Sequence, residues 1–400
     1  GNPLIEATDN LQTVDTLNPS TIAGAPVVSD VEITDADAVA PSTLSVSFTF
    51  DEDMDVTRDP AVTFDPAVAS TLIEGTPQGA WLGDGRTFKV DATVADAGVD
   101  VDQVKIDITD AYDVAGNLQA DHTATVDLEI DTQNPTATYS SAIILPNQAD
   151  GVASDADSVV AYTVDFSEPV SGIGGDDIRV DGGSVVPGTV SLSGDGLQAT
   201  FEVQANDNSV ANLVVTVKDT VTDLKGNKLV ESPSAAVAVD TENPEVTITD
   251  DQAGIAFDGA NVVTYTLTFS EPVQSVTEGD LTVTGAESFS VAHPANSDTA
   301  TVTVTVADGS TDNVSITVND SIVDIAGNPL IEATDNLQTV DTVNPSTAGA
   351  PTVSDAVITD ADDGSTLTVS FSFDEAMDQA APLPTVTFDP AVASTLTSQT

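Results

Sequence analysis

A five-residue pattern, Asp-Thr-x-Asn-Pro, recurs four times along this chain and constrains its fold more than any other feature. It begins at Asp15, Asp131, Asp240 and Asp341, at intervals of 116, 109 and 101 residues. A regular period of about 100 residues, with a proline-stiffened joint at each repeat, is typical of a tandem array of small domains. We therefore expect repeated modules joined at these motifs.

A second motif, Asp-x-x-Gly-Asn, precedes the last three joints and begins at Asp113, Asp223 and Asp324. The chain opens on Gly1-Asn2, the end of this motif, and residues 1–16 recur unchanged at 327–342, so we expect a window on a longer array. The predicted organisation is the last strand of a truncated module at 1–18, module 1 at 19–134, module 2 at 135–243, module 3 at 244–344, and the N-terminal part of a truncated fourth module at 345–400. This last segment, the stub, lacks its later strands, and we expect it not to close a two-sheet core.

Short stretches of alternating apolar and polar residues fill each module. Leu44-Ser45-Val46-Ser47-Phe48-Thr49-Phe50 is the clearest in module 1, and a period of two predicts a half-buried β-strand. Counting such stretches gives six or seven strands per module, separated by Gly, Asp, Asn and Pro, with no helical period. The predicted fold class is all-β, a tandem array of Ig-like antiparallel β-sandwiches. The strands are predicted at 27–33, 44–50, 62–64, 87–90, 104–108, 123–130, 159–166, 178–180, 200–203, 213–217, 246–248, 262–269, 281–283, 301–306, 314–318, 337–340 and 387–396.

The charge balance is extreme. The chain carries 66 Asp and Glu against 8 Lys and Arg, a net charge of −58, and no Lys or Arg follows Lys228. Carboxylates crowded without cationic partners repel one another, and burying them is costly. We expect something outside the sequence, a divalent cation, to neutralise them. Disorder is the alternative for so acidic a chain, but the strict alternation of apolar residues argues against it.

Composition also excludes several functions. Without Cys there is no disulfide, zinc-thiolate site or thiol nucleophile. No apolar run is long enough to cross a membrane, no signal peptide lies in this window, and nucleic acid would need a basic stripe. His122 and His293 stand singly, and aromatic residues make up 4% of the chain, so we expect no enzyme active site. Trp81 is expected in the core or as loop cover, with a sugar-stacking platform as the alternative.

The expected topology collects acidic residues at one end of each module. With strands A to G in order, the B–C and F–G loops lie beside the preceding joint. We predict metal ligands from the joint Asp, a Glu of the B–C loop, an Asp opening strand C, and the Asp of Asp-x-x-Gly-Asn. The candidates are Asp15, Glu52 and Asp113; Asp131, Glu168, Asp177 and Asp223; Asp240, Glu271, Asp280 and Asp324; and Asp341 and Glu375.

The chemistry of these ligands favours Ca²⁺. All are oxygen donors, and Ca²⁺ accepts about six to eight oxygens in flexible geometry, whereas Mg²⁺ needs a tight octahedron. The alternative is purely structural, because Asp-x-x-Gly-Asn also suits a tight loop and Asn-Pro also stiffens a linker. From the other end of the preceding module, Asp35 and Asp37, or Asp155 and Asp157, could approach the same joint or simply form solvated turns.

These motifs resemble a known family. Phe-Ser-Glu-Pro-Val at 166–170 and 269–273, a following Asp, Asp-x-x-Gly-Asn and Asp-Thr-x-Asn-Pro, in that order, are similar to the bacterial Ig-like (BIg) tandem repeats of giant secreted adhesins of the RTX or biofilm type. The resemblance covers essentially the whole chain, although module 1 has Asp51-Glu52-Asp53 where the others have Ser-Glu-Pro.

The resemblance implies an extender. It implies a monomeric, semi-rigid rod of sandwiches, secreted to the surface of a Gram-negative bacterium, with Ca²⁺ at the junctions, neighbouring modules as partners, and a distal ligand-binding region for cell adhesion or biofilm formation. Two alternatives stay open: an array of carbohydrate- or surface-binding modules, and the accessory region of a secreted polysaccharide-degrading enzyme.

Overall fold

The computed structural model describes residues 13–39, 42–74, 79–123, 127–144, 151–334, 337–382 and 384–388. The chain divides into two compact units, Gly1–Glu242 and Asn243–Thr400. Modules 1 and 2 belong to the first unit, and module 3 and the stub to the second. Within the described residues, regular structure is β apart from the four-residue helix α1 (Asp35–Ala38) and short 3-10 turns. The predicted all-β class is confirmed.

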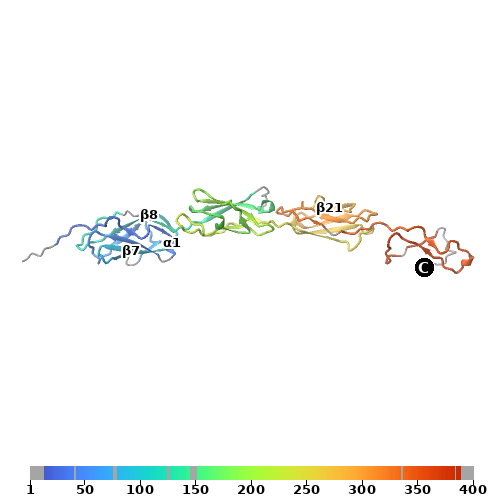
Figure 1. The fold of residues 1–400 in the computed structure, drawn as a ribbon, viewed down its shortest axis with the longest axis horizontal. Helices are drawn as coiled ribbons and strands as arrows, with labels where there is room; N and C mark the ends of the chain where they lie inside the picture. Colours follow the sequence, from blue (N-terminus) through green and yellow to red (C-terminus); the bar gives the residue numbers. More distant parts are fainter. Residues whose placement is uncertain are drawn as a thin grey trace, which may run out of the picture. The chain divides into compact units, whose positions relative to one another are not determined.

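Module 1 is a sandwich of two sheets. One contains, in spatial order, β1 (Val27–Val28), β3 (Thr43–Thr49), β7 (Thr87–Val94) and β5 (Leu72–Glu74), and β6 (Ala80–Trp81) also pairs with β7. The other contains β2 (Glu32–Thr34), β9 (Asp127–Asp131), β8 (Asp100–Thr109) and β4 (Ala61–Asp65). With β1 and β2 as a split strand A, the orders A-B-E-D and A′-G-F-C are those of an Ig-like fold. Figure 1 labels β7 and β8, one from each sheet.

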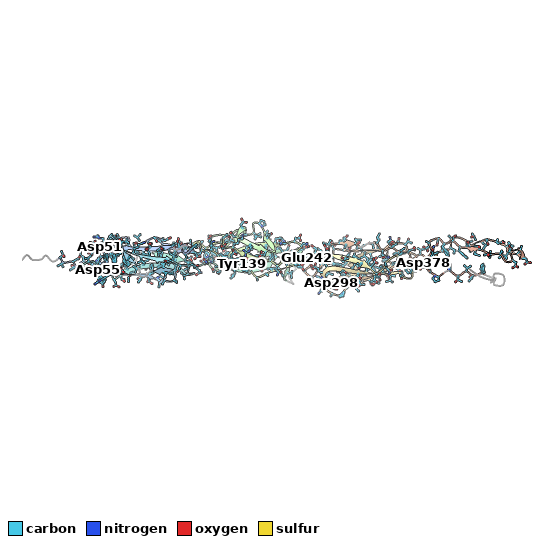
Figure 2. The ribbon with its side chains drawn as sticks, turned by 90° about the horizontal axis from the view of Figure 1, so that it is seen from below. Asp51, Asp55, Tyr139, Glu242, Asp298 and Asp378 are labelled. Atoms are coloured by element: carbon cyan, nitrogen blue, oxygen red, sulfur yellow. The ribbon has the colours of Figure 1, made fainter. Side chains whose placement is uncertain are left out.

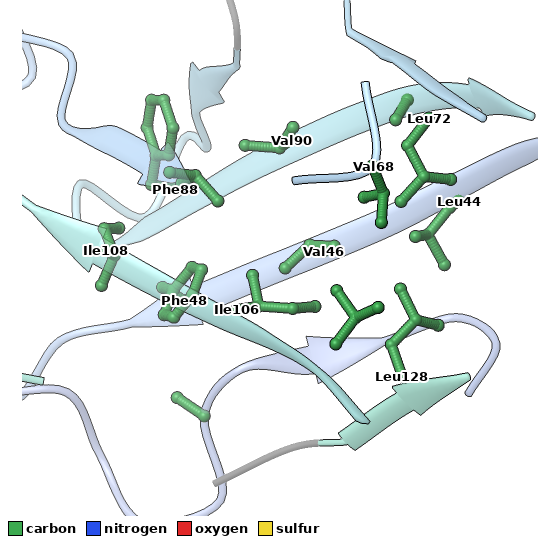
Figure 3. Packing of buried hydrophobic residues seen from close by; sticks show 14 of the residues in the cluster. Leu44, Val46, Phe48, Val68, Leu72, Phe88, Val90, Ile106, Ile108 and Leu128 are labelled. Atoms are coloured by element: carbon green, nitrogen blue, oxygen red, sulfur yellow. The ribbon is translucent and has the colours of Figure 1, made fainter. Parts of the chain in front are cut away.

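The core of module 1 follows the alternation in the sequence. Along β3, Leu44, Val46 and Phe48 are at most 1% exposed, whereas the residues between them face outward. Figure 3 shows this row packed with residues of β7 on its own sheet and with Ile106 and Ile108 of β8 on the facing sheet. Burying one such side chain contributes about 1.5–3 kcal/mol to folding, so the alternation selects which face turns inward.

Module 2 repeats this plan. One sheet contains β10 (Ala137–Ile143), β12 (Val159–Phe166), β16 (Gln198–Ala205) and β14 (Gly183–Val185), with β15 (Ser191–Leu192) also on β16. Facing it are β13 (Ile178–Asp181) paired with β17 (Val214–Val217), and β11 (Val152–Ala153) paired in parallel with β18 (Ala238–Val239). The rings of Tyr162 and Phe201 stack in its core with centroids 5.7 Å apart.

Module 3, in the second unit, has the same architecture. One sheet contains β19 (Val246–Asp250), β20 (Val262–Val273), β23 (Ser297–Thr305) and β22 (Ser288–Ala292), and the other contains β21 (Leu281–Thr284), β24 (Ser315–Val318) and β25 (Ala333–Thr334). The strand predicted at 337–340 is present only as single bridges, from Gln338 to Val314 and from Val340 to Ala256. Each of the three predicted whole modules contains one hydrophobic cluster.

The stub has no core of its own in the residues described. Its strands are β26 (Thr352–Val353) and β27 (Val369–Ser370), which pair with each other. None of residues 345–382 and 384–388 is buried, as expected for a sandwich without its later strands. The strand predicted at 387–396 lies almost entirely outside the described residues, as does most of the strand predicted in 1–18.

Candidate metal centre

Two groups of three carboxylates lie within the described residues of the first unit. One is Asp131, Glu168 and Asp223, and the other contains their counterparts in module 1, Asp15, Glu52 and Asp113. In each group, one oxygen from every member lies within 4.8 Å of the others. Each group combines the joint, the B–C loop and the F–G loop, which are the three segments that the topology placed together. We call the first group, with the joint that carries it, the Asp131 joint.

In the last three joints, the Thr of Asp-Thr-x-Asn-Pro anchors the joint to the end of the preceding module. Thr132, Thr241 and Thr342 are at most 2% exposed. The Oγ1 of Thr241 donates to the carbonyl of Asn206 at 2.7 Å and accepts the Ser209 N–H at 3.0 Å. Thr342 makes the same pair of bonds to the matching loop of module 3. The Asp before this Thr is therefore held at a fixed place at the end of the sandwich.

The F–G loop holds its Asp by a ring of N–H donors. Asp223 Oδ1 accepts the backbone N–H of Lys225, Gly226 and Asn227 at 2.7, 2.7 and 2.9 Å, and Oδ2 accepts Asn227 Nδ2 at 2.8 Å. Gly226 has φ +96°, which a side chain would make strained. The tight-loop interpretation thus holds for this motif. Since a carboxylate offers about four acceptor sites, Oδ2 retains one for a cation.

Asn227 connects three segments. Its side chain is fully buried, Nδ2 donates to the carbonyl of Asp131 at 3.0 Å, and Oδ1 accepts the N–H of Asp35 at 2.9 Å. Asp35 opens α1 of module 1, so this loop of module 2 contacts both the joint and the preceding module. In module 1, Asn117 donates to the carbonyl of Asp15 in the same way, at 3.4 Å.

The B–C loop is fastened to the joint beside Glu168. Thr136 N–H donates to Ser167 Oγ at 2.9 Å, and Ser167 N–H donates to the Thr136 carbonyl at 3.0 Å. Burial, followed by the charges of Asp131 and Asp223, raises the pKa of Glu168 to about 7. Burial also raises the pKa of Asp131. These carboxyl groups are therefore poorly stabilised as anions.

Among the residues that the structure describes, three buried oxygens at this joint have no hydrogen-bond donor: Glu168 Oε1, Asp35 Oδ1 and Asn134 Oδ1. Burial, followed by the charges of Asp96 and Asp223, raises the pKa of Asp35. Buried acceptors without donors are rare and costly. All three are oxygens of the kind that bind hard cations, so the residues present fit a Ca²⁺ ion.

In module 1, the counterpart group is more exposed. Burial, then the charges of Asp15 and Asp113, raises the pKa of Glu52. Burial also raises the pKa of Asp113, but hydrogen bonds from Asn117 and neighbouring N–H groups outweigh it and bring the pKa below its usual value. Figure 2 labels Asp51 and Asp55, which flank Glu52 on the same loop.

The predicted strand-C ligands, Asp177 and Asp280, lie outside the carboxylate groups found among the described residues. Asp177 accepts the Gly174 N–H and the Thr220 hydroxyl, both at 2.8 Å. Asp280 likewise accepts the Thr277 N–H and the Ser321 hydroxyl, both at 2.8 Å. Each carboxylate caps a 3-10 turn before strand C, and neither joins a carboxylate group. The spacing Gly/Thr-x-x-Asp could have indicated this, because it matches a helix-capping pattern.

The remaining candidate ligands lie in turns, loops and one strand. Asp37 and Asp157 cap their own turns through Thr34 and Ser154, so only Asp35 of the first pair approaches the next joint. Asp324 is buried and repeats the bonding of Asp223. Asp240 lies at the end of the first unit, Glu271 lies in β20, and Asp341 accepts the Val343 N–H. Glu375 lies next to Asp374, whose carboxylate binds Ser346.

One contact at the Asp131 joint was not predicted. Lys225 Nζ lies 2.5 Å from Glu32 Oε1 and 2.9 Å from Glu129 Oε2, both in module 1. Hydrogen bonds to Glu129 and Glu32 raise the pKa of Lys225. The signal in the sequence was a Lys inside Asp-x-x-Gly-Asn, where the other two copies carry Ala115 and Ala326.

Trp81 serves as loop cover on the core. It is half-buried, its ring lies 5.3 Å from that of Phe88 and 5.9 Å from that of Phe50, and Nε1 donates to the carbonyl of Arg58 at 2.8 Å. Its indole N–H is thus already satisfied inside module 1. In the described part of the chain, no helix has the length and apolar character needed to cross a membrane.

Comparison with known proteins supports the resemblance drawn from the motifs. Residues 240–344 match the family model of the bacterial Ig-like domain. The matched segment is module 3 with the joint before it, and the predicted resemblance is confirmed there. No curated protein matches the chain.

Several solved structures are similar to the chain at low identity. The I9–I11 tandem of titin shows 9% identity over 82% of this chain and 98% of its own, with a TM-score of 0.25. The Yersinia pseudotuberculosis adhesin InvE shows 15% identity over 52% of this chain and 59% of its own, with a TM-score of 0.20. The S-layer protein rSbsC shows 14% identity over 90% and 63%, with a TM-score of 0.17. Scores this low carry no argument about function.

Proposed function

We propose that this chain is a structural extender region of a large bacterial surface adhesin. Its Ig-like modules form a non-catalytic, monomeric rod, stiffened by Ca²⁺ at the joints, that projects a distal ligand-binding region for cell adhesion or biofilm formation. The observation that carries the proposal is the Asp131 joint, where three carboxylates converge and, within the described part of the chain, three buried oxygens lack donors. The bacterial Ig-like match of residues 240–344 supports the type of module.

The residues that would hold the ion come from both sides of the joint. Asp131 and Asn134 belong to the joint itself, Glu168 and Asp223 to loops of module 2, and Asp35 to module 1. Bound there, Ca²⁺ supplies a double positive charge to carboxylates that otherwise repel one another. Binding ties the joint to two loops, so it restricts the angle between modules 1 and 2.

The charge and the expected location agree with this role. A net charge of −58 keeps neighbouring copies soluble and apart. Outside the cell, Ca²⁺-binding modules work with dissociation constants of about 10⁻⁴ to 10⁻³ M, so sites of modest affinity would stay occupied. We therefore propose a secreted, cell-surface location.

Calorimetric titration of the metal-free chain, combined with small-angle scattering, tests the proposal. We expect Ca²⁺ to bind, to raise the melting temperature and to lengthen the mean end-to-end distance, with Mg²⁺ far less effective. A variant with Glu52, Glu168 and Glu271 each replaced by Gln should lose most of this response. The matched control is Asp298→Asn, an exposed acid of β23 (Figure 2), which should respond like the wild type. Absent binding and unchanged melting and scattering would reject calcium at the joints.

A further inference from the structure

Lys225 of module 2 forms ion pairs with two glutamates of module 1. Glu32 of β2 and Glu129 of β9 are register partners across parallel strands. Like charges directly opposite each other destabilise a sheet, so these two carboxylates need a cation between them. Lys225 Nζ supplies it, at 2.5 and 2.9 Å.

The loop that carries Lys225 is itself held in place. Its Asp223 is bonded to three backbone N–H groups, and its Asn227 binds Asp131 and Asp35 at the end of module 1. The ammonium group is therefore presented by a fixed loop, which reduces the conformational entropy lost when it pairs. The charge of Lys225 also reaches Asp131, whose pKa it lowers against the stronger effect of burial.

Of the three complete Asp-x-x-Gly-Asn loops in this sequence, only the one in module 2 carries a Lys. The equivalent positions of modules 1 and 3 are Ala115 and Ala326, and no Lys or Arg follows Lys228. At joints with Ala at this position, the F–G loop carries no Lys or Arg side chain. Lys225 therefore marks the joint between modules 1 and 2 as different from its repeats.

We propose that Lys225 is a charge clasp that docks the F–G loop of module 2 onto the Glu32–Glu129 face of module 1. The clasp keeps this joint aligned when divalent metal is absent. It acts on alignment more than on folding, because half-exposed ion pairs contribute little to the stability of a fold. It depends on protein charges alone and does not rest on calcium binding.

Pulsed electron paramagnetic resonance on the full chain tests the clasp. The chain has no native Cys, so two introduced thiols can be labelled cleanly. Thr63→Cys and Ser184→Cys place labels on exposed strand positions of modules 1 and 2, and Ser184→Cys with Thr282→Cys spans the next joint. Measurements in chelator at low salt report the width of each distance distribution.

In chelator, we expect a narrow distance distribution for the 63/184 pair. Lys225→Ala should broaden this distribution about twofold. Salt at about 1 M should do the same, because the Debye length is then about 3 Å. Lys225→Arg should stay narrow. Reversing the charges, with Lys225→Glu, Glu32→Lys and Glu129→Lys together, should restore the narrow width that Lys225→Glu alone loses. Equal widths for wild type and Lys225→Ala, or no rescue by the reversal, would overturn the proposal.

Two further readouts separate the clasp from folding and from calcium. Thermal unfolding of Lys225→Ala should stay close to that of the wild type, because the ion pairs are half-exposed. Adding Ca²⁺ should narrow the 184/282 distribution if calcium stiffens joints. If it does not, the calcium proposal fails, while the comparison in chelator still decides the clasp.

Discussion

The side-chain amide of Asn227 donates a 3.0 Å hydrogen bond to the main-chain carbonyl of Asp131, which lies 96 residues earlier in the chain. The same side chain accepts the N–H of Asp35 and donates to Asp223. The last residue of Asp-x-x-Gly-Asn therefore connects its own loop, the joint and the preceding module. This explains why the motif ends on an amide, which can donate and accept at once.

Replacing Asn227 with Ala should destabilise the chain by about 1–3 kcal/mol, because buried partners at Asp35, Asp131 and Asp223 lose their hydrogen bonds. Urea unfolding followed by circular dichroism measures the loss. Asn212→Ala is the matched control, since Asn212 is exposed and its loss should change stability little. A similar effect from both variants would show that the position of Asn227 is not special.

Replacing Glu168 with Gln should have opposite effects with and without metal. In chelator, the variant should melt at a higher temperature, because one of three mutually repelling carboxylates has lost its charge. In Ca²⁺, it should bind at least about tenfold more weakly, since a charged ligand is lost. Calorimetry measures the melting temperature in chelator and the affinity for Ca²⁺. Glu287→Gln, at an exposed position, is the control. A loss of stability in chelator would contradict the repulsion argument.

The metal-free chain should become less stable as the pH rises from about 4.5 to about 7. The folded pKa of Glu168 is about 7, against 4.5 for the free side chain. The folded state therefore holds this proton more tightly than the unfolded state, and the advantage disappears as the group ionises. Thermal unfolding of the metal-stripped chain across this range measures the trend, which Glu168→Gln should flatten. By the same linkage, Ca²⁺ affinity should fall below about pH 7, because the ion must displace the proton.

Replacing Thr241 with Val should cost about 1–2 kcal/mol of stability, since the buried Thr241 hydroxyl would no longer bond the Asn206 carbonyl and the Ser209 N–H. Thr241→Ser keeps the hydroxyl and should retain most of the stability. Chemical unfolding of the two variants side by side separates the hydrogen bonds from the loss of a methyl group. Equal losses in both would assign the effect to packing.

Local patterns in the sequence were enough to predict many of the strands, but not β10, β14 or β22. The alternation of Leu44, Val46 and Phe48 identifies β3 because adjacent residues alone decide which face is apolar. Strand β14 was missed because Gly183-Ser184-Val185 is short and contains Gly, and its pairing with β16 is decided by tertiary contacts. A strand was predicted at 337–340 because its alternation is clear. The structure has only single bridges there, because tertiary contacts also decide whether a strand pairs.

The part of the candidate site that depends on strand order was predictable from the sequence. The order of strands brings Asp131, Glu168 and Asp223 to one end, and the structure places them together. The order of strands did not show that the carboxylate of Asp177 also caps a nearby turn. The bridge from Lys225 to Glu32 joins residues 193 positions apart in different modules, and no rule of spacing in one sequence reveals such a partner.

The parallel pairings described above have a mechanical consequence. In module 1, β2 near the start runs parallel to β9 at the end, and in module 2, β11 runs parallel to β18. Pulling the two ends of a module apart slides such strands past each other, so their evenly spaced bonds share the load and must rupture together. Tension on either module is thus resisted by its parallel pair, β2 with β9 in module 1 and β11 with β18 in module 2.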